Sequence, residues 1–224
     1  MIFLAGYQFD WRVVTDRWHL FVEGAWVDLR VAMIGFALAC GLGLINALLR
    51  TSGIRIFSIP SFLYVQVMRG VPLYVLLLWV YFGIANITGI TFTSFQAIVI
   101  ALALTGSGYT TEIFRAGLGA IDRGQMEAAR SIGLSRVRTY GHVILPQALR
   151  IVVPPLGNTF VGLLKGATIM AVIAVPDMVF LANELNVTLF TPFEVFAAVA
   201  LILIVMVLFF SAVVYLLERR LRLA

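Results

Sequence analysis

The longest polar stretch of the chain, residues 122–146, reads DRGQMEAARSIGLSRVRTYGHVILP. Residues 125–132 are mostly helix formers, and Gly133 follows them, where glycine can adopt the left-handed conformation that ends a helix. Ser135 can cap the start of a second short helix. Pro146 would limit that helix or kink its junction with the segment that follows. The stretch therefore predicts a short helix, a turn and another short helix.

Apolar segments lie on both sides of this stretch. The chain is 62% hydrophobic and 12% charged, with a mean hydropathy of +1.02, so its own polar surface cannot cover it and lipid must do so. A helix needs about 20 residues to cross a bilayer. We expect an all-α membrane protein with a transmembrane domain over residues 20–224, preceded by a terminal segment, residues 1–19. Its five transmembrane helices are predicted at residues 20–49, 59–85, 95–117, 151–175 and 193–217.

The loops between these five segments alternate in charge. The first loop holds Arg50 and Arg55, and the third loop and the C-terminal tail are also rich in arginine, whereas the second and fourth loops have no basic residue. Basic residues favour the cytosolic side. We therefore expect a cytosolic C-terminus, an N-terminus outside, and residues 120–146 along the cytosolic face. Because arginines at segment ends account for the net charge of +5, no nucleic-acid partner is expected.

The spacing within the polar stretch is more specific than its composition. Glu127-Ala128-Ala129 is followed by three residues and Gly133, then by nine residues, a valine, one residue and Leu145-Pro146. This spacing resembles the signature of the permease subunits of ATP-binding-cassette importers that depend on a solute-binding protein. Further matches in the same order resemble the polar amino-acid permeases of the histidine and glutamine type: Arg69-Gly70-Val71-Pro72-Leu73, Tyr81-Phe82-Gly83, Tyr109, Glu112-Ile113, Arg115-Ala116-Gly117, Leu145-Pro146-Gln147-Ala148, Pro154-Pro155-Leu156 and Leu163-Leu164-Lys165.

The resemblance implies a multi-pass permease subunit in the bacterial cytoplasmic (inner) membrane, surrounded by lipid, that imports a polar amino acid. Its implied partners are a cytosolic dimer of ATP-binding-cassette ATPases, a second permease that is identical or homologous, and an extracytoplasmic solute-binding protein. Residues 120–146 would be the coupling region. The residues implied to couple to the ATPase are Gly124, Gln125, Glu127, Ala128, Ala129 and Gly133.

The chain itself is expected to be a transport subunit and not an enzyme. It has no Gly-x-x-x-x-Gly-Lys-Ser/Thr stretch to cradle phosphates, and no Cys, His and carboxylate residues at metal-ligand spacing. No cofactor or metal is expected on this chain, and ATP with Mg²⁺ would bind the partner ATPase.

Two positions bear on the substrate. Gly166-Ala167-Thr168 stands where the family commonly has Asp-Thr-Ser, and Gly108 is the small residue before Tyr109. Both lie near the expected translocation path, so the amino acid that passes through stays open.

Among the charged residues of the predicted spans, Arg69, Glu112 and Lys165 are the least easily placed in water. A charge there costs about 2.5–3.5 kcal/mol on insertion scales and tends to face the interior. In one interpretation, Arg69 or Lys165 binds a substrate carboxylate and Glu112 binds an amino group. In the other, Glu112 forms an internal ion pair with Arg69 or Lys165, or a local pair with Arg115 at helix spacing.

Other polar and helix-breaking residues fall within the same spans. Gly70 and Pro72 predict a helix irregularity, which membrane proteins tolerate where it lines a cavity. Asn158, Thr159 and Thr168 could line the same path, or form hydrogen bonds between helices.

Two other classes of function stay open on the sequence alone. An ion-gradient-driven transporter or channel, acting without an ATPase, would explain the charges within the spans but not the spacing that begins at Glu127. A non-transporting assembly subunit is the second.

Overall fold

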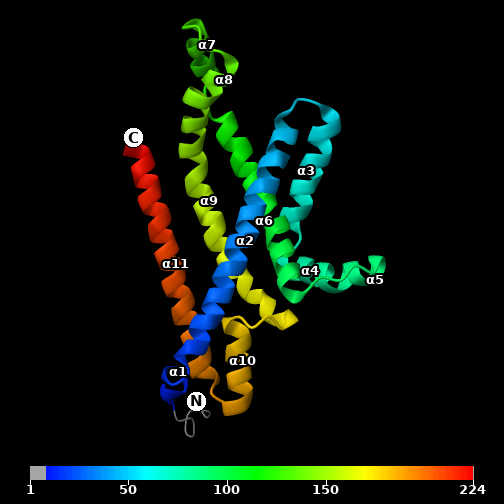
Figure 1. The fold of residues 1–224 in the computed structure, drawn as a ribbon, viewed down its shortest axis with the longest axis vertical. Helices are drawn as coiled ribbons and strands as arrows, with labels where there is room; N and C mark the ends of the chain where they lie inside the picture. The colour runs from blue at the N-terminus through cyan, green and yellow to red at the C-terminus, as the bar shows by residue number, and fades with distance from the viewer. Residues whose placement is uncertain (1–8, 224) are drawn as a thin grey trace, which may run out of the picture.

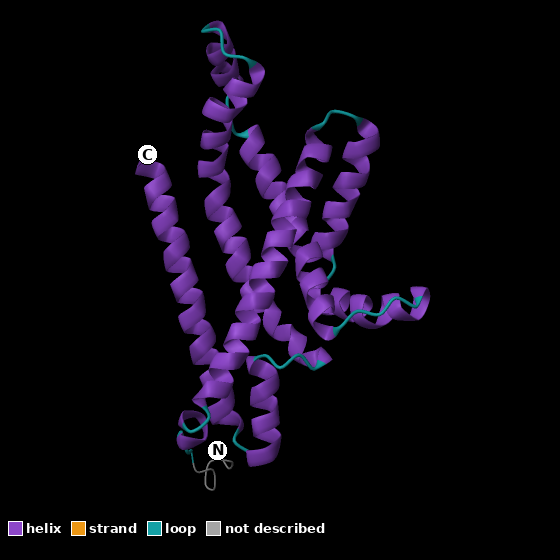
Figure 2. Ribbon diagram, viewed as in Figure 1, coloured by secondary structure: helices purple, strands orange, loops and turns teal. Residues whose placement is uncertain are grey.

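The computed structural model describes residues 9–223. All regular structure among these residues is helical (Figures 1 and 2), which confirms the predicted fold class. Two π-helical segments, Trp79–Gly83 and Tyr140–Ile144, lead into α5 and α9, and a 3-10 segment, Thr168–Ile173, follows α9. The α-helices are α1 (Arg12–Thr15), α2 (Trp18–Thr51), α3 (Arg55–Gly70), α4 (Leu73–Leu78), α5 (Ile84–Thr88), α6 (Ser94–Gly119), α7 (Arg123–Ser131), α8 (Arg136–Thr139), α9 (Leu145–Ala167), α10 (Met178–Leu189) and α11 (Pro192–Leu223).

Within residues 9–223, four helical segments are long and apolar enough to cross a membrane. A fifth crossing exists if α3 and the helical segment Leu73–Thr88 are counted together as one broken span. The prediction of several membrane-spanning helices is therefore confirmed, with four or five candidates. The four continuous segments are Trp18–Thr51, Ser94–Gly119, Arg136–Ile173 and Pro192–Leu221.

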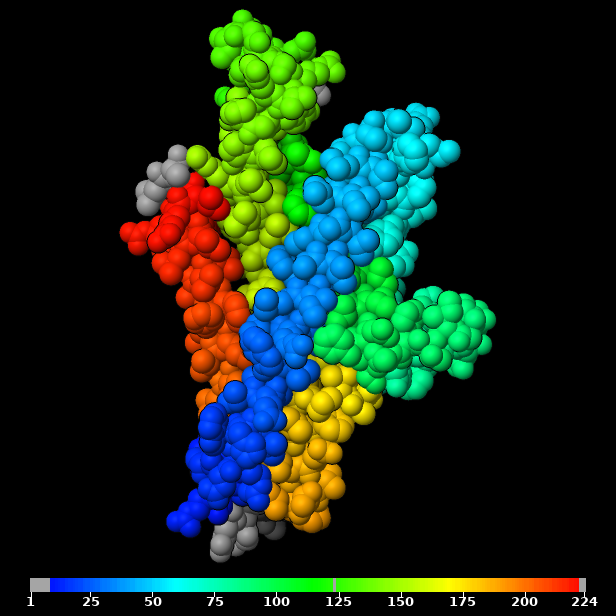
Figure 3. Space-filling view, in the orientation of Figure 1, coloured from blue at the N-terminus to red at the C-terminus, as the bar shows by residue number. Residues whose placement is uncertain are grey.

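The break after α3 is a corner of 104°. Val71 (φ −82°, ψ 126°) and Pro72 (φ −58°, ψ 137°) both have extended backbones, and proline has no N–H with which to continue the helix. Residues 73–88, the α4–α5 arm, consequently leave the bundle sideways (Figures 1 and 3). The irregularity predicted at Gly70 and Pro72 is present, but the sequence did not indicate so sharp a turn.

The coupling region differs from its prediction at its second helix. α8 continues through Tyr140–Ile144 into α9, so the helical segment begins at Arg136 and not near residue 151. Pro146 does not end a helix; it lies in the first turn of α9, directly after the π-helical segment. That wider turn changes the hydrogen-bond register just before Pro146, where its missing N–H is tolerated.

Small residues let α2 and α6 pack closely. A Cβ atom at Gly43 would overlap the Thr110 hydroxyl oxygen, and one at Gly106 would lie 2.8 Å from Ala39 Cβ. The Thr110 hydroxyl donates a hydrogen bond to the Ala39 carbonyl at 2.7 Å. Close backbone approach of this kind is a main source of helix association in lipid.

Replacing Gly43 by valine is expected to lower the free energy of unfolding by about 3 kcal/mol, the upper end of the usual cost of overpacking. Gly41→Val is the matched control, because Gly41 lies on the same helix with no atom within 4 Å of its Cβ position. Thermal unfolding of the full chain in detergent measures both. Equal unfolding temperatures for the two variants would contradict the close packing of α2 on α6.

The two ends of the bundle carry different elements. α7 and α8 form one end, and the C-terminus of α11 points toward it; α1 and α10 lie at the opposite end, with the N-terminus (Figure 1). The described part of the chain therefore starts with α1 at one end of the bundle and finishes with α11 pointing toward the other (Figure 1).

Candidate coupling and transport site

Both ends of α7 are capped. At its start, the Asp122 carboxylate accepts a hydrogen bond from the Gly124 N–H at 2.7 Å. At its end, Gly133 has a φ of +86°, and the Leu134 N–H donates to the Ala129 carbonyl at 3.2 Å. This is the Schellman arrangement, which favours glycine at the left-handed position. The predicted helix stop at Gly133 is confirmed.

The outer surface of α7 carries most of the residues proposed to couple. Ala129 differs from the rest because it is only 5% exposed, while α7 packs on the Tyr140–Ile144 segment. The Gln147 Nε2 amide donates a hydrogen bond to the side-chain oxygen of Gln125, Oε1, at 3.3 Å, and this bond joins α9 to α7. The surface open to a partner therefore consists of Gly124, Gln125, Glu127, Ala128 and Gly133.

Two apolar residues at this end were not singled out in the sequence. Ile132 is 79% exposed and Val137 is 83% exposed, on either side of the turn between α7 and α8. Exposed aliphatic side chains next to small residues suit a protein contact. The signal that could have found them is their position, since they are apolar residues within the most polar stretch of the chain.

A cleft of about 950 Å³ lies behind α7, between it, the ends of α2 and α6, and the Tyr140–Ile144 segment. Its charged lining residues are Arg50, Arg115 and Arg130, opposed by Asp122 and Glu127. Both signs of charge therefore face this cleft at the same end of the bundle as the coupling region.

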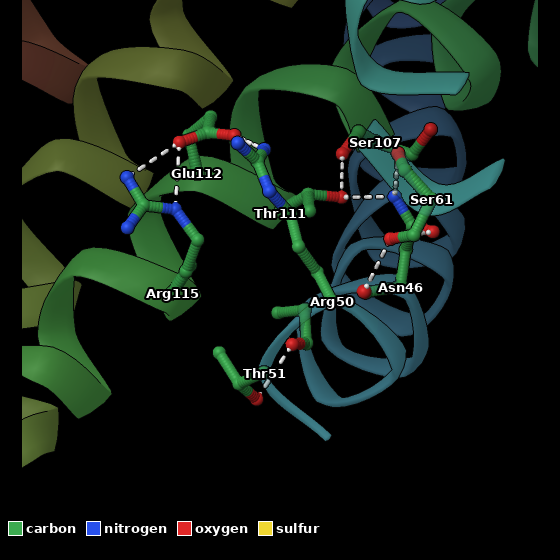
Figure 4. A network of polar contacts seen from close by, with 9 residues as sticks. Asn46, Arg50, Thr51, Ser61, Ser107, Thr111, Glu112 and Arg115 are labelled. Carbon is green, nitrogen blue, oxygen red and sulfur yellow. Dashed lines mark hydrogen bonds and ion pairs between the residues drawn. The ribbon is translucent and has the colours of Figure 1, made fainter. Parts of the chain in front are cut away.

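Glu112 binds two arginines at the edge of this cleft (Figure 4). Its Oε1 accepts from Arg50 of α2, and its Oε2 accepts from Nε and Nη2 of Arg115, at 2.9 Å each. The local pair with Arg115 is confirmed, whereas an ion pair of Glu112 with Arg69 or Lys165 is not formed. No local sequence pattern indicates the pairing of Glu112 with Arg50, because the two residues lie 62 positions apart in the chain.

A chain of polar contacts continues from this ion network between α2, α3 and α6 (Figure 4). The Ser61 hydroxyl donates to Asn46 Oδ1 at 2.7 Å, and Asn46 Nδ2 donates to the Thr111 hydroxyl at 3.3 Å. The hydroxyls of Tyr64 and Ser107 are 2.6 Å apart. The three helices are thereby joined by buried hydrogen bonds as well as by packing, a feature that polar residues within apolar spans could have signalled.

Arg69 lies beside the corner of the broken span. Its guanidinium carbon is 5.3 Å from the centre of the Tyr109 ring, within cation–π range. A Cβ at the neighbouring Gly108 would come within 2.9 Å of Arg69 Cγ, so a small residue is required there. The end of α9 reaches the same corner, because a Cβ at Gly166 would lie 3.0 Å from Leu73 Cδ2.

The remaining residues predicted for the path lie along α9 and just beyond it. Lys165 is exposed, and within residues 9–223 its ammonium group forms no ion pair. Asn158 is also exposed. The hydroxyls of Thr159 and Thr168 donate to carbonyls of their own helical segment, at Pro155 and Lys165, 2.9 Å in both cases. Neither threonine joins two helices.

In the part of the chain that the structure describes, no group of three or more His, Cys, Asp or Glu residues could hold a metal ion. The arrangement supplies exposed small and apolar residues on and beside α7, three helices joined by buried hydrogen bonds, and cationic groups near a break in a span.

Comparison with known proteins agrees with this geometry. The chain is 34% identical over 209 residues to the probable glutamine ABC transporter permease protein GlnM of Bacillus subtilis (strain 168), covering 93% of this chain and 96% of the relative. It is 32% identical over 216 residues to the glutamine transport system permease protein GlnP of Escherichia coli (strain K12), covering 96% and 99%. A crystal structure of an amino acid ABC transporter with histidines matches with a TM-score of 0.88 at 36% identity, over 96% of this chain and all of that one.

A family model also matches most of the chain, over residues 30–223. Its description is binding-protein-dependent transport system inner membrane component. Members are non-enzymatic, multi-pass components of transport systems, which the exposed apolar helices and the docking surface on α7 fit. The chain belongs to the family of binding-protein-dependent transport system inner membrane components.

Proposed function

We propose that this chain is the permease subunit of an ATP-driven importer that carries a polar amino acid across the bacterial cytoplasmic membrane. The observation that supports this proposal most is the coupling region: a capped helix with exposed small residues at the end of the bundle, flanked by exposed Ile132 and Val137. The names of the relatives, two glutamine permeases and an amino acid transporter, favour a polar amino acid as the substrate.

The proposed orientation places α7, α8 and the C-terminus in the cytosol, with α1 and α10 outside. The end of α11, which carries Arg219 and Arg220, supports it, because it points toward the α7 end (Figure 1). The turn from α2 into α3 also lies toward that end, and Arg50 and Arg55 belong to the helix ends on either side of it. On this orientation the coupling region meets the ATPases, and the opposite end meets the solute-binding protein.

The proposed partners are two ATPase subunits, which bind ATP and Mg²⁺, a second permease that is identical or homologous, and a solute-binding protein. ATP binding closes the ATPases, and the movement of α7 follows that closure as a rigid-body switch. α8 and α9 form one helical segment, so a displacement at Arg136 is carried along about 40 Å of helix, at 1.5 Å per residue, to Lys165.

We place the substrate path at the corner between α3 and α4. Arg69 and Lys165 carry positive charges beside this corner and the adjoining end of α9, which suits a substrate carboxylate. Asn158, Thr159 and Thr168 are proposed to line the path along α9. Glu112 is a weaker candidate for a substrate amino group, because both its oxygens bind arginine.

Reconstitution in liposomes tests the proposed function. The purified chain alone is expected to show no uptake of labelled glutamine, histidine or arginine under a proton or sodium gradient. Together with its ATPase, its partner permease and its binding protein, it is expected to take up one of these amino acids only when ATP is supplied. Gradient-driven uptake by the chain alone would favour the ion-coupled alternative.

A further inference from the structure

Two aspartates from distant parts of the sequence are buried where α10 begins against α2. Asp28 lies on α2, Asp177 caps the start of α10, and both are 0% exposed. Gly24, one turn before Asp28, allows this approach: a Cβ there would lie 2.6 Å from the Met178 nitrogen and 2.9 Å from the Asp177 carbonyl carbon. Both aspartates therefore lie at one close approach of α10 to α2.

In each carboxyl group, one oxygen accepts a hydrogen bond and the other does not. The Met178 N–H donates to Asp28 Oδ2 at 3.5 Å, and the Phe180 N–H donates to Asp177 Oδ1 at 2.7 Å. The other two oxygens, Asp28 Oδ1 and Asp177 Oδ2, are buried and have no hydrogen-bond partner in the described part of the chain. Within the described residues, these two carboxyl oxygens are thus left without a hydrogen-bond donor.

Among the side chains that the structure describes, no arginine or lysine forms an ion pair with either carboxyl group. The charged and titratable residues nearest to the pair in the sequence are His19, Glu23 and Arg30 on α2 and Glu184 on α10, all exposed. On α11, which packs against both helices, Glu194 is buried and accepts from the Asp10 N–H at 2.9 Å.

Two ionised carboxylates cannot be kept together in such a place at low cost. An uncompensated buried charge is so unfavourable that the group takes up a proton instead, and a neighbouring like charge adds to this tendency. Burial raises the pKa of Asp177 to about 6. A protonated carboxyl group gains an O–H donor, which the unbonded oxygen of the other can accept.

We propose that Asp28 and Asp177 share one proton, in a carboxyl–carboxylate hydrogen bond that fastens α10 to α2. The proton belongs to the pair and not to either residue. A carboxyl group that holds its proton more tightly when folded stabilises the fold below its unfolded pKa, about 3.9, and this stability is lost as pH rises through the folded pKa. The attachment of α10 therefore weakens as pH increases.

Thermal unfolding of the full chain in detergent, from about pH 5 to about pH 8, tests this linkage. The unfolding temperature of Asp28→Asn is expected to change less than half as much as that of the wild type, since an asparagine amide can donate to Asp177 at every pH. Asp177→Asn should behave alike, because asparagine still caps α10. Glu184→Gln, at an exposed position on α10, is the matched control and should keep the wild-type slope.

Infrared spectroscopy of the wild type gives a second readout that does not depend on a variant folding. A carbonyl stretching band of a protonated carboxylic acid is expected at neutral pH, and it should be absent in both asparagine variants. Sodium chloride in place of choline chloride at fixed pH should leave the wild-type unfolding temperature unchanged. The shared proton would be overturned if the band were absent, or if both asparagine variants kept the wild-type dependence of unfolding temperature on pH. Stabilisation by sodium would also overturn it, and would favour a bound cation instead.

Discussion

Ala128→Arg is expected to reduce ATP-driven uptake at least about tenfold, equivalent to about 1.4 kcal/mol of coupling free energy, while the chain should still insert in the membrane. Ala128 is exposed on α7, and its small side chain lets a partner approach the helix backbone. An arginine there would hold a docked ATPase away from the helix. Uptake into proteoliposomes containing the complete transporter measures the effect, and ATPase activity measured in parallel shows whether hydrolysis continues without transport.

The matched control is Ala120→Arg. Ala120 is an exposed alanine at the same end of the bundle, directly after α6, but it lies outside α7. This variant should keep most of the wild-type uptake, because the added charge stands outside the proposed docking surface. If Ala128→Arg transports as well as Ala120→Arg with the ATPase bound, α7 is not the docking surface.

Glu112→Gln is expected to lower the free energy of unfolding by about 2–3 kcal/mol. Breaking a fully buried ion pair costs about 3–5 kcal/mol, and the Glu112, Arg50 and Arg115 side chains are 22%, 19% and 43% exposed, so solvent offsets part of that cost. The loss arises because Arg50 and Arg115 keep their charges and lose their shared partner. Thermal or denaturant unfolding of the full chain in detergent measures it.

Two further variants separate the contributions to this network. Arg115→Ala should cost about 1 kcal/mol or less, because its pair with Glu112 is the more exposed one. The double variant Arg50→Met/Glu112→Leu should be more stable than Glu112→Leu alone. The single variant leaves the Arg50 charge without its partner, and the double variant removes that charge as well. If Glu112→Gln unfolds at the wild-type temperature, the ion network does not stabilise the contact between α2 and α6.

The local features of the fold were predictable because they depend on neighbouring residues. The apolar segments follow from hydropathy, and the helix stop at Gly133 follows from the left-handed conformation that glycine accepts. The break at Gly70 and Pro72 follows from the missing N–H of proline. The similarity to a permease family also rested on short motifs, each made of neighbouring residues, and the comparison with known proteins confirms that family.

The sequence was misleading where a local residue preference conflicted with a longer helix or with packing between helices. Pro146 suggested either the end of a short helix or a kink at its junction with the next segment, and the helical segment from Arg136 to Ile173 does not end there. The π-helical turn at Tyr140–Ile144 accommodates the proline, and no residue type in that turn indicates it. Ala129 likewise suggested a docking surface, whereas the fold of α7 over this turn buries it.

By itself, the sequence determined that the chain is helical, that it belongs in a membrane, and that residues 122–146 form a distinct polar element. These properties depend on composition and on residues a few positions apart. Only the tertiary structure decided that Glu112 binds Arg50, that Asp28 lies against the start of α10, and that α4 turns away at 104°. The physical reason is that charge pairing and burial depend on which helices pack together, and helix packing joins residues that are far apart in the chain.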